Sequence, residues 1–130
     1  MGRQHMRGES IEVRQQKIGA RHWLPIHPNL KAELAHADSK HLTFIVTEYE
    51  APFSVAGFGG WFSDAARAAG LTDRSLHGLR KSAARRLAEA SCSTKQIAAV
   101  TGHASLREVE RYTLAAEQER LAADAIKRIL

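Results

Sequence analysis

The N-terminal part of the chain follows the two-residue period of paired strands. Apolar and polar residues alternate over residues 11–16, as they do in a half-buried strand. Residues 17–20 then read as a turn, and residues 21–26 resume the extended pattern. Pro25 lacks a backbone N–H group, so the second segment belongs at a sheet edge or a strand end. Together the two segments predict a β-hairpin that carries Lys17 at its tip.

Between the hairpin and the middle of the chain, the pattern predicts a helix, a strand and a second helix. Pro28 suits the first turn of a helix that runs to about Ala37. The apolar run of residues 42–46 predicts a short buried strand. A further helix is predicted over about residues 60–69, with Gly70 closing it as a typical C-terminal cap.

The remainder of the chain predicts helices. From residue 76 onward, apolar residues recur at spacings of three and four, which predicts a helix that buries one stripe. The stripe consists of Leu76, Leu79, Ala83, Leu87 and Ala90. Residues 93–96 and 105–108 both have the form of a capping box, so each predicts a helix start. Residues 101–104 form the break between these helices, and a last amphipathic helix is predicted from about Leu114.

These elements define an α+β fold, in which a β-hairpin or three-stranded antiparallel sheet packs against a mostly helical bundle. The length of 130 residues corresponds to a single domain. An apolar content of 44% is typical of a globular protein and excludes a disordered or membrane-embedded one. Cys92 is the one cysteine, so an internal disulfide is excluded and the cytoplasm is the default compartment. We interpret Cys92 as a small apolar residue near a helix end.

The net charge of +5 is concentrated in one segment. Residues 1–73 contain eight basic and eight acidic residues, whereas residues 74–95 contain six basic residues and the single acidic residue Glu89. A local basic surface attracts polyanions, because neutralising their phosphates releases counterions. On charge alone, a solubilising helix face is an equally good interpretation.

Two histidines, an arginine and a tyrosine in the second half form a set that can handle a phosphodiester. His77 and Arg80 lie one helical turn apart, so their side chains can reach the same point. Arginine binds phosphate bidentately, and histidine transfers protons near neutrality. His103 follows Gly102 in the predicted turn, and Tyr112 comes nine residues later. Each residue alone is more typical of an ordinary surface or half-buried position, so the chemistry is indicated by their conjunction.

The order and spacing of these residues resemble the catalytic signature of the tyrosine recombinases, the phage integrase family. The neighbouring residues match as well, in three segments: 76–83 (LHGLRKSA), 101–105 (TGHAS) and 110–113 (ERYT). Residues 16–19 resemble the β-hairpin that carries the family's lysine, and residues 24–26 resemble the strand that follows it. The resemblance runs from about residue 8 to residue 130 and is highly specific, because it rests on several separate motifs.

The resemblance implies a reaction and a role for each residue. Tyr112 would attack a DNA phosphodiester and form a 3′-phosphotyrosyl link, which conserves the bond energy for religation. Arg80 would stabilise the charge that builds on the phosphate, and His103 would donate a further hydrogen bond to it. His77 would assist proton transfer at the nucleophile, and Lys17 would protonate the departing 5′-hydroxyl as general acid. No metal or other cofactor is expected, since the seven histidines show no metal-ligand spacing.

The resemblance also implies partners and a setting. Double-stranded DNA would be the substrate, and basic residues of the charged segment would contact it. These are Arg74, Lys81, Arg85 and Lys95. Residues 114–130 have the amphipathic arc to dock on another recombinase protomer, although packing within the same chain fits the sequence equally well. The protein would act in the cytoplasm, encoded by a bacterium, a phage or another mobile element, and would join the nucleoid when bound to DNA.

The sequence departs from the family pattern at two points. The family uses a first arginine on a helix upstream of the hairpin, and Arg3 and Arg7 lie too close to the first strand to fill that role. Because the sequence also has no counterpart of the family's N-terminal core-binding domain, we interpret residues 1–130 as part of a catalytic domain. Loss of a charge-stabilising donor costs several kcal/mol in the transition state, so this polypeptide is expected to cleave DNA poorly alone. Ile18 stands where the family often has threonine, which affects local loop contacts.

Two other interpretations are open from the sequence. Residues 94–102, followed by the helix from residue 105, resemble a helix-turn-helix, the unit of many non-enzymatic DNA-binding modules. The second helix carries Glu108 and Glu110, which make a poor surface for a major groove, and this interpretation leaves the Lys17 hairpin unexplained. The other alternative is a degenerate recombinase remnant that folds without activity.

Overall fold

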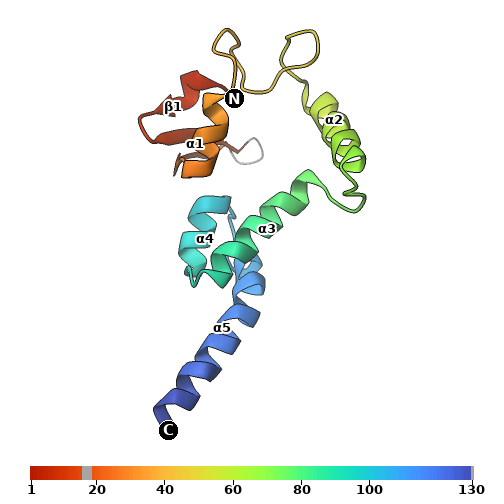
Figure 1. Cartoon of the computed structure of the whole chain (residues 1–130). Coiled ribbons are helices and arrows are strands. Elements are labelled where there is room, and N and C mark those ends of the chain that lie inside the picture. Colours follow the sequence, from red (N-terminus) through yellow and green to blue (C-terminus); the bar gives the residue numbers. More distant parts are fainter. Residues whose placement is uncertain (16–18, 130) are drawn as a thin grey trace. The chain divides into compact units, whose positions relative to one another are not determined.

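The computed structural model describes residues 1–15 and 19–129, which form two compact units, Met1–Thr72 and Asp73–Leu130 (Figure 1). The described elements are, in chain order, η1 (Arg3–His5), β1 (Met6–Arg7), β2 (Ser10–Arg14), β3 (Arg21–Pro25), α1 (Pro28–Ala35), α2 (Val55–Ala68), α3 (Leu76–Glu89), α4 (Thr94–Thr101) and α5 (Leu106–Ile129). An antiparallel sheet with separate helices confirms the predicted α+β class. Lys17, at the predicted hairpin tip, lies outside the described residues.

The described strands of the first unit form one antiparallel sheet in the order β1-β2-β3. Strands β2 and β3 are the predicted hairpin, with Ile11 opposite Leu24 and Arg14 opposite Arg21. Ile11 is buried, as the alternating pattern predicted for one face of the hairpin. The third strand is β1, which comes before the hairpin and pairs Met6 with Ile11.

The predicted strand at residues 42–46 is wrong. The segment forms bends and contributes an isolated bridge between Val46 and Pro52. Leu42 is 78% exposed, so the apolar run is not buried as a strand would be. A strand needs a neighbouring strand with which its backbone groups form a regular ladder of hydrogen bonds. This segment instead makes separate bonds, such as the one from the Phe44 N–H to the Met1 carbonyl at 3.0 Å.

The two helices of the first unit lie where the pattern predicted helices, with one shifted boundary. Helix α1 begins at Pro28 as predicted. Helix α2 begins at Val55, five residues earlier than predicted, because the Ser54 hydroxyl accepts a hydrogen bond from the Gly57 N–H at 3.0 Å and caps the helix there. Gly70 follows the end of α2 with a φ of +76°, the left-handed cap that was predicted.

The second unit is built around a small core at which its three helices meet. Its buried side chains are Ala84 and Ala88 from α3, Ile97 from α4 and Val109 from α5. Cys92 packs against this core and is partly buried, which confirms its interpretation as a small apolar residue near a helix end.

The buried stripe of α3 differs from the predicted one. Leu79 is 57% exposed and Leu76 is 38% exposed, whereas Ala84 and Ala88 are buried. Small side chains let α4 and α5 approach α3 closely, so the alanines set the packed face. Arg80 lies one turn before Ala84 on the same face. The correction therefore places Arg80 at the edge of the core.

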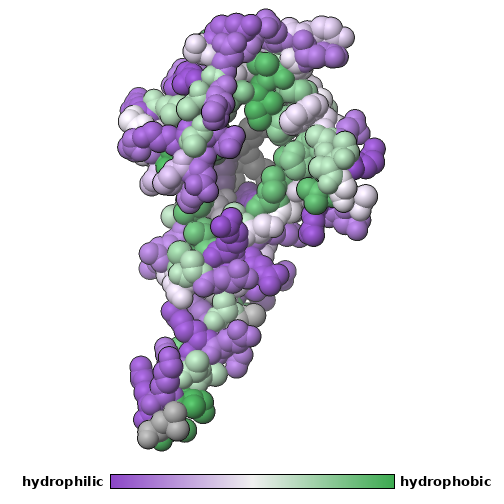
Figure 2. Space-filling view, viewed as in Figure 1, coloured by the Kyte–Doolittle hydropathy of each residue, from purple (hydrophilic) through white to green (hydrophobic). Residues whose placement is uncertain are grey.

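Helix α5 is one continuous helix of 24 residues, where two helices were predicted. No glycine or proline interrupts residues 106–129, so nothing in the sequence breaks the backbone bonding. Tyr112 therefore lies inside a helix that continues for more than four turns beyond it. The later part of α5 carries exposed apolar residues among hydrophilic ones (Figure 2). They are Leu114, Leu121, Ile126 and Ile129. Neither α5 nor any other helix in the described part of the chain is long and apolar enough to cross a membrane.

Candidate active site

The first turns of α3 position His77 and Arg80. The Ser75 hydroxyl accepts a hydrogen bond from the Gly78 N–H at 3.1 Å, which fixes the helix start just before His77. His77 is exposed and Arg80 is half-buried. The Nε atom of Arg80 is buried and has no hydrogen-bond partner within the described part of the chain. A buried guanidinium nitrogen without a partner is unfavourable, so the site favours a ligand that supplies an acceptor.

The turn between α4 and α5 positions His103. Gly102 ends α4 in the left-handed conformation, with a φ of +69°, and its N–H donates to the Ala98 carbonyl at 2.7 Å. Glycine adopts this conformation without the penalty that other residues meet. The sharp turn brings His103 back toward the end of α4, where its Nδ1 atom lies 2.6 Å from the Thr101 hydroxyl oxygen.

Helix α5 positions Tyr112 beside this turn. Val109 and Thr113 are buried on either side of Tyr112 along the helix, and they fix which face of α5 meets the core. Tyr112 packs against the core and is itself half-buried. Its ring centroid lies 6.3 Å from that of His103, with the ring planes 48° apart. The tyrosine is thus held firmly by packing and still reaches the surface.

His77, Arg80, His103 and Tyr112 meet in one cleft of about 200 Å³. Its remaining lining residues are Lys81, Glu108 and Arg111. All seven belong to the second unit, so the geometry of the cleft is internal to that unit. Two arginines and a lysine against a single carboxylate suit the cleft to an anion. Among the described residues, no group of three or more His, Cys, Asp or Glu side chains is placed to hold a metal ion.

The surroundings of His103 set its protonation state. Burial lowers the pKa of His103 below its usual value, and the charge of Arg80 lowers it further. Glu108 opposes this effect, and His77 adds a small lowering contribution. With a lowered pKa the imidazole is neutral at neutral pH, so His103 is ready to accept a proton.

The residues predicted to contact DNA are exposed on the second unit. Lys81 lines the cleft itself. Lys95 lies in the first turn of α4, and Arg74 precedes α3. Arg85 is ion-paired with Glu89, with 2.8 Å between Nε and Oε1, so its charge is partly neutralised. All four residues belong to the same unit as the cleft.

Three residues at the site were not singled out from the sequence. Glu108 and Arg111 line the cleft, and Thr101 contacts His103. Glu108 lies four residues before Tyr112, a spacing that places both on one helix face. That signal was present in the sequence, because both residues belong to the helix that was predicted from residue 105.

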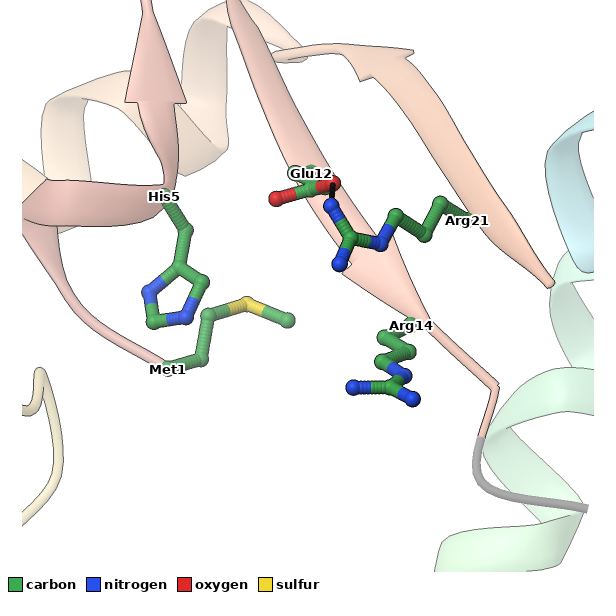
Figure 3. Close-up of a pocket in the computed structure, with 5 residues that line it drawn as sticks. All are labelled: Met1, His5, Glu12, Arg14 and Arg21. Carbon is green, nitrogen blue, oxygen red and sulfur yellow. Dashed lines mark hydrogen bonds and ion pairs between the residues drawn. The ribbon is translucent and has the colours of Figure 1, made fainter. Parts of the chain in front are cut away.

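The first unit carries a separate hollow on its sheet, shown in Figure 3. Arg21 reaches across the hairpin to Glu12, with 3.4 Å between Nη1 and Oε1. Arg14 lies opposite Arg21 at the last strand pair before the hairpin loop, and Figure 3 shows no ion pair between Arg14 and the other residues drawn. Among the predicted catalytic residues that the structure describes, none lines this hollow.

Comparison with known proteins decides the family. The sequence profile of the phage integrase family matches residues 6–119. The chain belongs to the phage integrase family. The matched range includes all four residues of the cleft that carry the predicted chemistry, and the family predicted from the motifs is confirmed. A search of curated proteins finds no match.

Solved integrase structures share the fold of this family member. The integrase of the transposon Tn1549 in complex with transposon right-end DNA has a TM-score of 0.56 and 15% identity, with 88% of this chain and 48% of that chain covered. The same integrase in complex with a circular-intermediate DNA has a TM-score of 0.54 and 16% identity, with 87% and 47% covered. The chain thus spans about half the length of the structures that it matches.

Proposed function

We propose that this integrase-family chain is the catalytic part of a tyrosine recombinase, which cuts and rejoins DNA at specific sites. The observation that carries the proposal is the cleft that holds Tyr112 together with His77, Arg80 and His103. A nucleophile beside fixed cations is what covalent attack on a phosphodiester requires. The DNA bound in the Tn1549 integrase structures supports DNA as the substrate.

Tyr112 is the nucleophile in this mechanism. Its hydroxyl oxygen bonds to the phosphorus, the bond from phosphorus to the 5′-oxygen breaks, and the 3′ end of the DNA becomes linked to the protein. A phenol is largely protonated at neutral pH, so its proton must leave during the attack. His77, which lines the same cleft, assists this transfer. The new phosphotyrosyl bond is again a phosphodiester, so a 5′-hydroxyl can reverse the reaction without a nucleotide cofactor.

Arg80 stabilises the charge that develops on the phosphate. Its half-buried position lowers the local dielectric, which strengthens its interaction with an anion. The Nε atom of Arg80 has no hydrogen-bond partner among the described residues. This supports the role, because a phosphate oxygen would satisfy that nitrogen. His103 supplies a further contact to the phosphate. Lys17, which lies outside the described residues, is the proposed general acid for the departing 5′-oxygen.

Residues 1–130 by themselves are proposed to cleave DNA poorly. Both arginines near the start are already engaged: Arg3 Nη2 donates to the Ala37 carbonyl at 2.8 Å, and Arg7 lies 4.9 Å from the ring centroid of Trp23. Neither is therefore assigned as the first arginine of the family, and the barrier rises by several kcal/mol without that donor. Efficient covalent trapping of a nicked duplex by this polypeptide would contradict this part of the proposal.

Basic residues in both units are proposed to bind DNA phosphates. Arg14 and Arg21 stand opposite each other on the sheet. Glu12 offsets part of the charge of Arg21, and a bound phosphate would offset more of the repulsion between the two arginines. On the second unit, Lys81 and Lys95 are exposed and make no ion pair within the described part of the chain. Each lost phosphate contact should reduce the slope of log affinity against log salt by about 0.9. Unchanged slopes for Lys81→Ala and Lys95→Ala would remove these two residues from the interface.

The later part of α5 is proposed to dock on a neighbouring protomer when DNA is bound. Leu114, Leu121, Ile126 and Ile129 in this part of the helix are exposed. Ala116 still packs against the core of its own unit, so truncation after Gln118 removes the exposed residues Leu121, Ile126 and Ile129 and leaves the core intact. Light scattering with DNA should show a smaller assembly for the truncated chain. An unchanged molar mass would contradict docking between protomers.

The test of the proposed chemistry is a pair of tyrosine variants. Tyr112→Phe removes only the hydroxyl, and Tyr49→Phe does the same at the other tyrosine of the chain, which is 83% exposed. Duplexes enriched from a random pool by binding to the chain serve as substrate, with a nick that traps the intermediate. All three proteins should bind with similar affinity. A slowly formed, denaturant-resistant adduct should appear for the wild type and Tyr49→Phe, and be absent for Tyr112→Phe.

A non-catalytic helix-turn-helix module is the second candidate, because α4, the Gly102 turn and α5 have that succession. In this case the wild type and Tyr112→Phe behave alike, with binding and no adduct from either. A degenerate remnant gives neither binding nor adduct.

A further inference from the structure

A chain of two hydrogen bonds determines which ring nitrogen of His103 carries a proton. The Thr101 hydroxyl donates to the Ile97 carbonyl at 2.7 Å and lies 2.6 Å from Nδ1 of His103. A hydroxyl has one proton, and a carbonyl oxygen can only accept. With the Thr101 proton directed to Ile97, the second contact is a hydrogen bond only if Nδ1 of His103 donates it. The neutral imidazole is therefore the Nδ1–H tautomer, with its lone pair on Nε2.

The residues that form this hydrogen-bond chain are held rigidly. Ile97 is fully buried, Thr101 is the last residue of α4, and Gly102 is buried between Thr101 and His103 in the left-handed conformation. Core packing fixes Thr101 and the turn fixes His103, and Gly102 is the one residue between them. The Thr101 hydroxyl and the His103 ring therefore stay close to each other. The second ring nitrogen, Nε2, is the one left for a ligand in the cleft.

We propose that Thr101 is a positioning residue that makes His103 bind a phosphate only in its protonated form. The proposal rests on the proposed function, in that the ligand is a DNA phosphate. In the neutral Nδ1–H tautomer, Nε2 is an acceptor and opposes a phosphate oxygen, which is an acceptor too. Uptake of one proton converts Nε2 into a donor. Phosphate binding in this cleft is therefore coupled to protonation of His103.

The charges around His103 define the pH range of this coupling. Helix α3 presents His77, Arg80 and Lys81, and helix α5 presents Glu108, Arg111 and Tyr112. Without DNA, burial and Arg80 lower the pKa of His103, and a bound phosphate raises it again by its negative charge. Between the free and bound values, binding takes up one proton, so affinity decreases about tenfold for each unit that the pH rises.

The first experiment measures the tautomer directly. Long-range ¹H–¹⁵N NMR spectra of the free protein, recorded well above the pKa of His103, distinguish the two neutral forms. The wild type and Thr101→Ser, which keeps the hydroxyl, should both show Nδ1–H at His103. Thr101→Val is nearly isosteric and lacks the hydroxyl, so it should show a larger Nε2–H population. The proposal is overturned if the wild type shows Nε2–H at His103, and this measurement needs no variant. An unchanged tautomer in Thr101→Val overturns it as well.

The second experiment measures the coupling. Fluorescence anisotropy gives the Kd for a binding-selected duplex between pH 5.5 and 8. As the pH rises, log affinity should fall more steeply for the wild type and Thr101→Ser than for Thr101→Val, by about one log unit per pH unit, which corresponds to one proton. The shallower slope of Thr101→Val is expected because its neutral Nε2–H can already donate. Equal slopes overturn the coupling. If no variant binds DNA, the proposed function fails and the coupling fails with it, while the NMR spectra still decide the role of Thr101.

Discussion

Replacing Gly102 by alanine should destabilise the second unit and disturb the turn that carries His103. Gly102 is buried and has a φ of +69°. A residue with a Cβ atom costs roughly 1–2 kcal/mol in this left-handed region. Gly70 provides a matched control, because it also follows a helix, its φ is +76°, and an added Cβ would meet nothing within 4 Å. The Gly70→Ala variant therefore measures the backbone cost alone, and Gly102→Ala should cost at least as much.

Urea unfolding with two signals separates the units. Both tryptophans, Trp23 and Trp61, lie in the first unit, so their fluorescence reports on that unit. Far-UV circular dichroism is weighted toward the second unit, which contains the 24-residue helix α5. With a slope of about 1 kcal/mol per molar urea, typical of the smallest domains, the dichroism midpoint of Gly102→Ala should fall by about 1–2 M. An unchanged dichroism midpoint in Gly102→Ala, alongside a lowered fluorescence midpoint in Gly70→Ala, would refute the reasoning.

Other substitutions test the core, the pH dependence, the site and the surface separately. Ile97 is fully buried, so urea unfolding should show losses of about 2–5 kcal/mol for Ile97→Ala and about 0.5–1.5 kcal/mol for Ile97→Val. Because the pKa of His103 is lowered in the folded chain, the unfolded chain binds more protons, and stability should fall as the pH drops below about 6.5. Urea midpoints measured against pH should show a flatter decline for His103→Gln. Arg80→Lys should slow adduct formation by about 100-fold or more in the trapping assay, with DNA affinity by anisotropy changed only a few-fold. Glu89→Gln breaks an ion pair whose side chains are 77% and 54% exposed, so its unfolding free energy should change by less than about 1 kcal/mol.

Local signals predicted the elements better than they predicted their packing. The capping box of Ser93 and Gln96 correctly located the start of α4, because a cap depends on neighbouring residues alone. The strand predicted at residues 42–46 failed because an apolar run says nothing about a partner edge. On α3 the large side chain of Leu79 suggested the buried face, whereas the small residues Ala84 and Ala88 form it. Which face is buried depends on how closely neighbouring helices approach, and one helix considered alone does not specify that.

The spacing of the motifs predicted the convergence of His77, Arg80, His103 and Tyr112, and the cleft brings these four together. The contact between Thr101 and His103 could not be predicted, because it depends on the left-handed conformation of Gly102 between them. Glu108 and Arg111 were missed although they belong to the same predicted helix as Tyr112, because spacing along one helix does not specify which of its faces borders the cleft. The recognised motif residues, and not the hydrophobic periodicity, therefore predicted which distant segments of the chain come together.

The attack of Tyr112 on a DNA phosphodiester can be tested with a substrate that carries an activated leaving group. In a binding-selected duplex, sulfur replaces the bridging 5′-oxygen at each step in turn. A thiolate leaves without a proton donor, so cleavage no longer requires Lys17, and the weak activity expected of this polypeptide becomes measurable. We expect a stable adduct that mass spectrometry locates at Tyr112, present for Tyr49→Phe and absent for Tyr112→Phe. An adduct at another residue, or bound DNA with no adduct at any position, would contradict the attack by Tyr112.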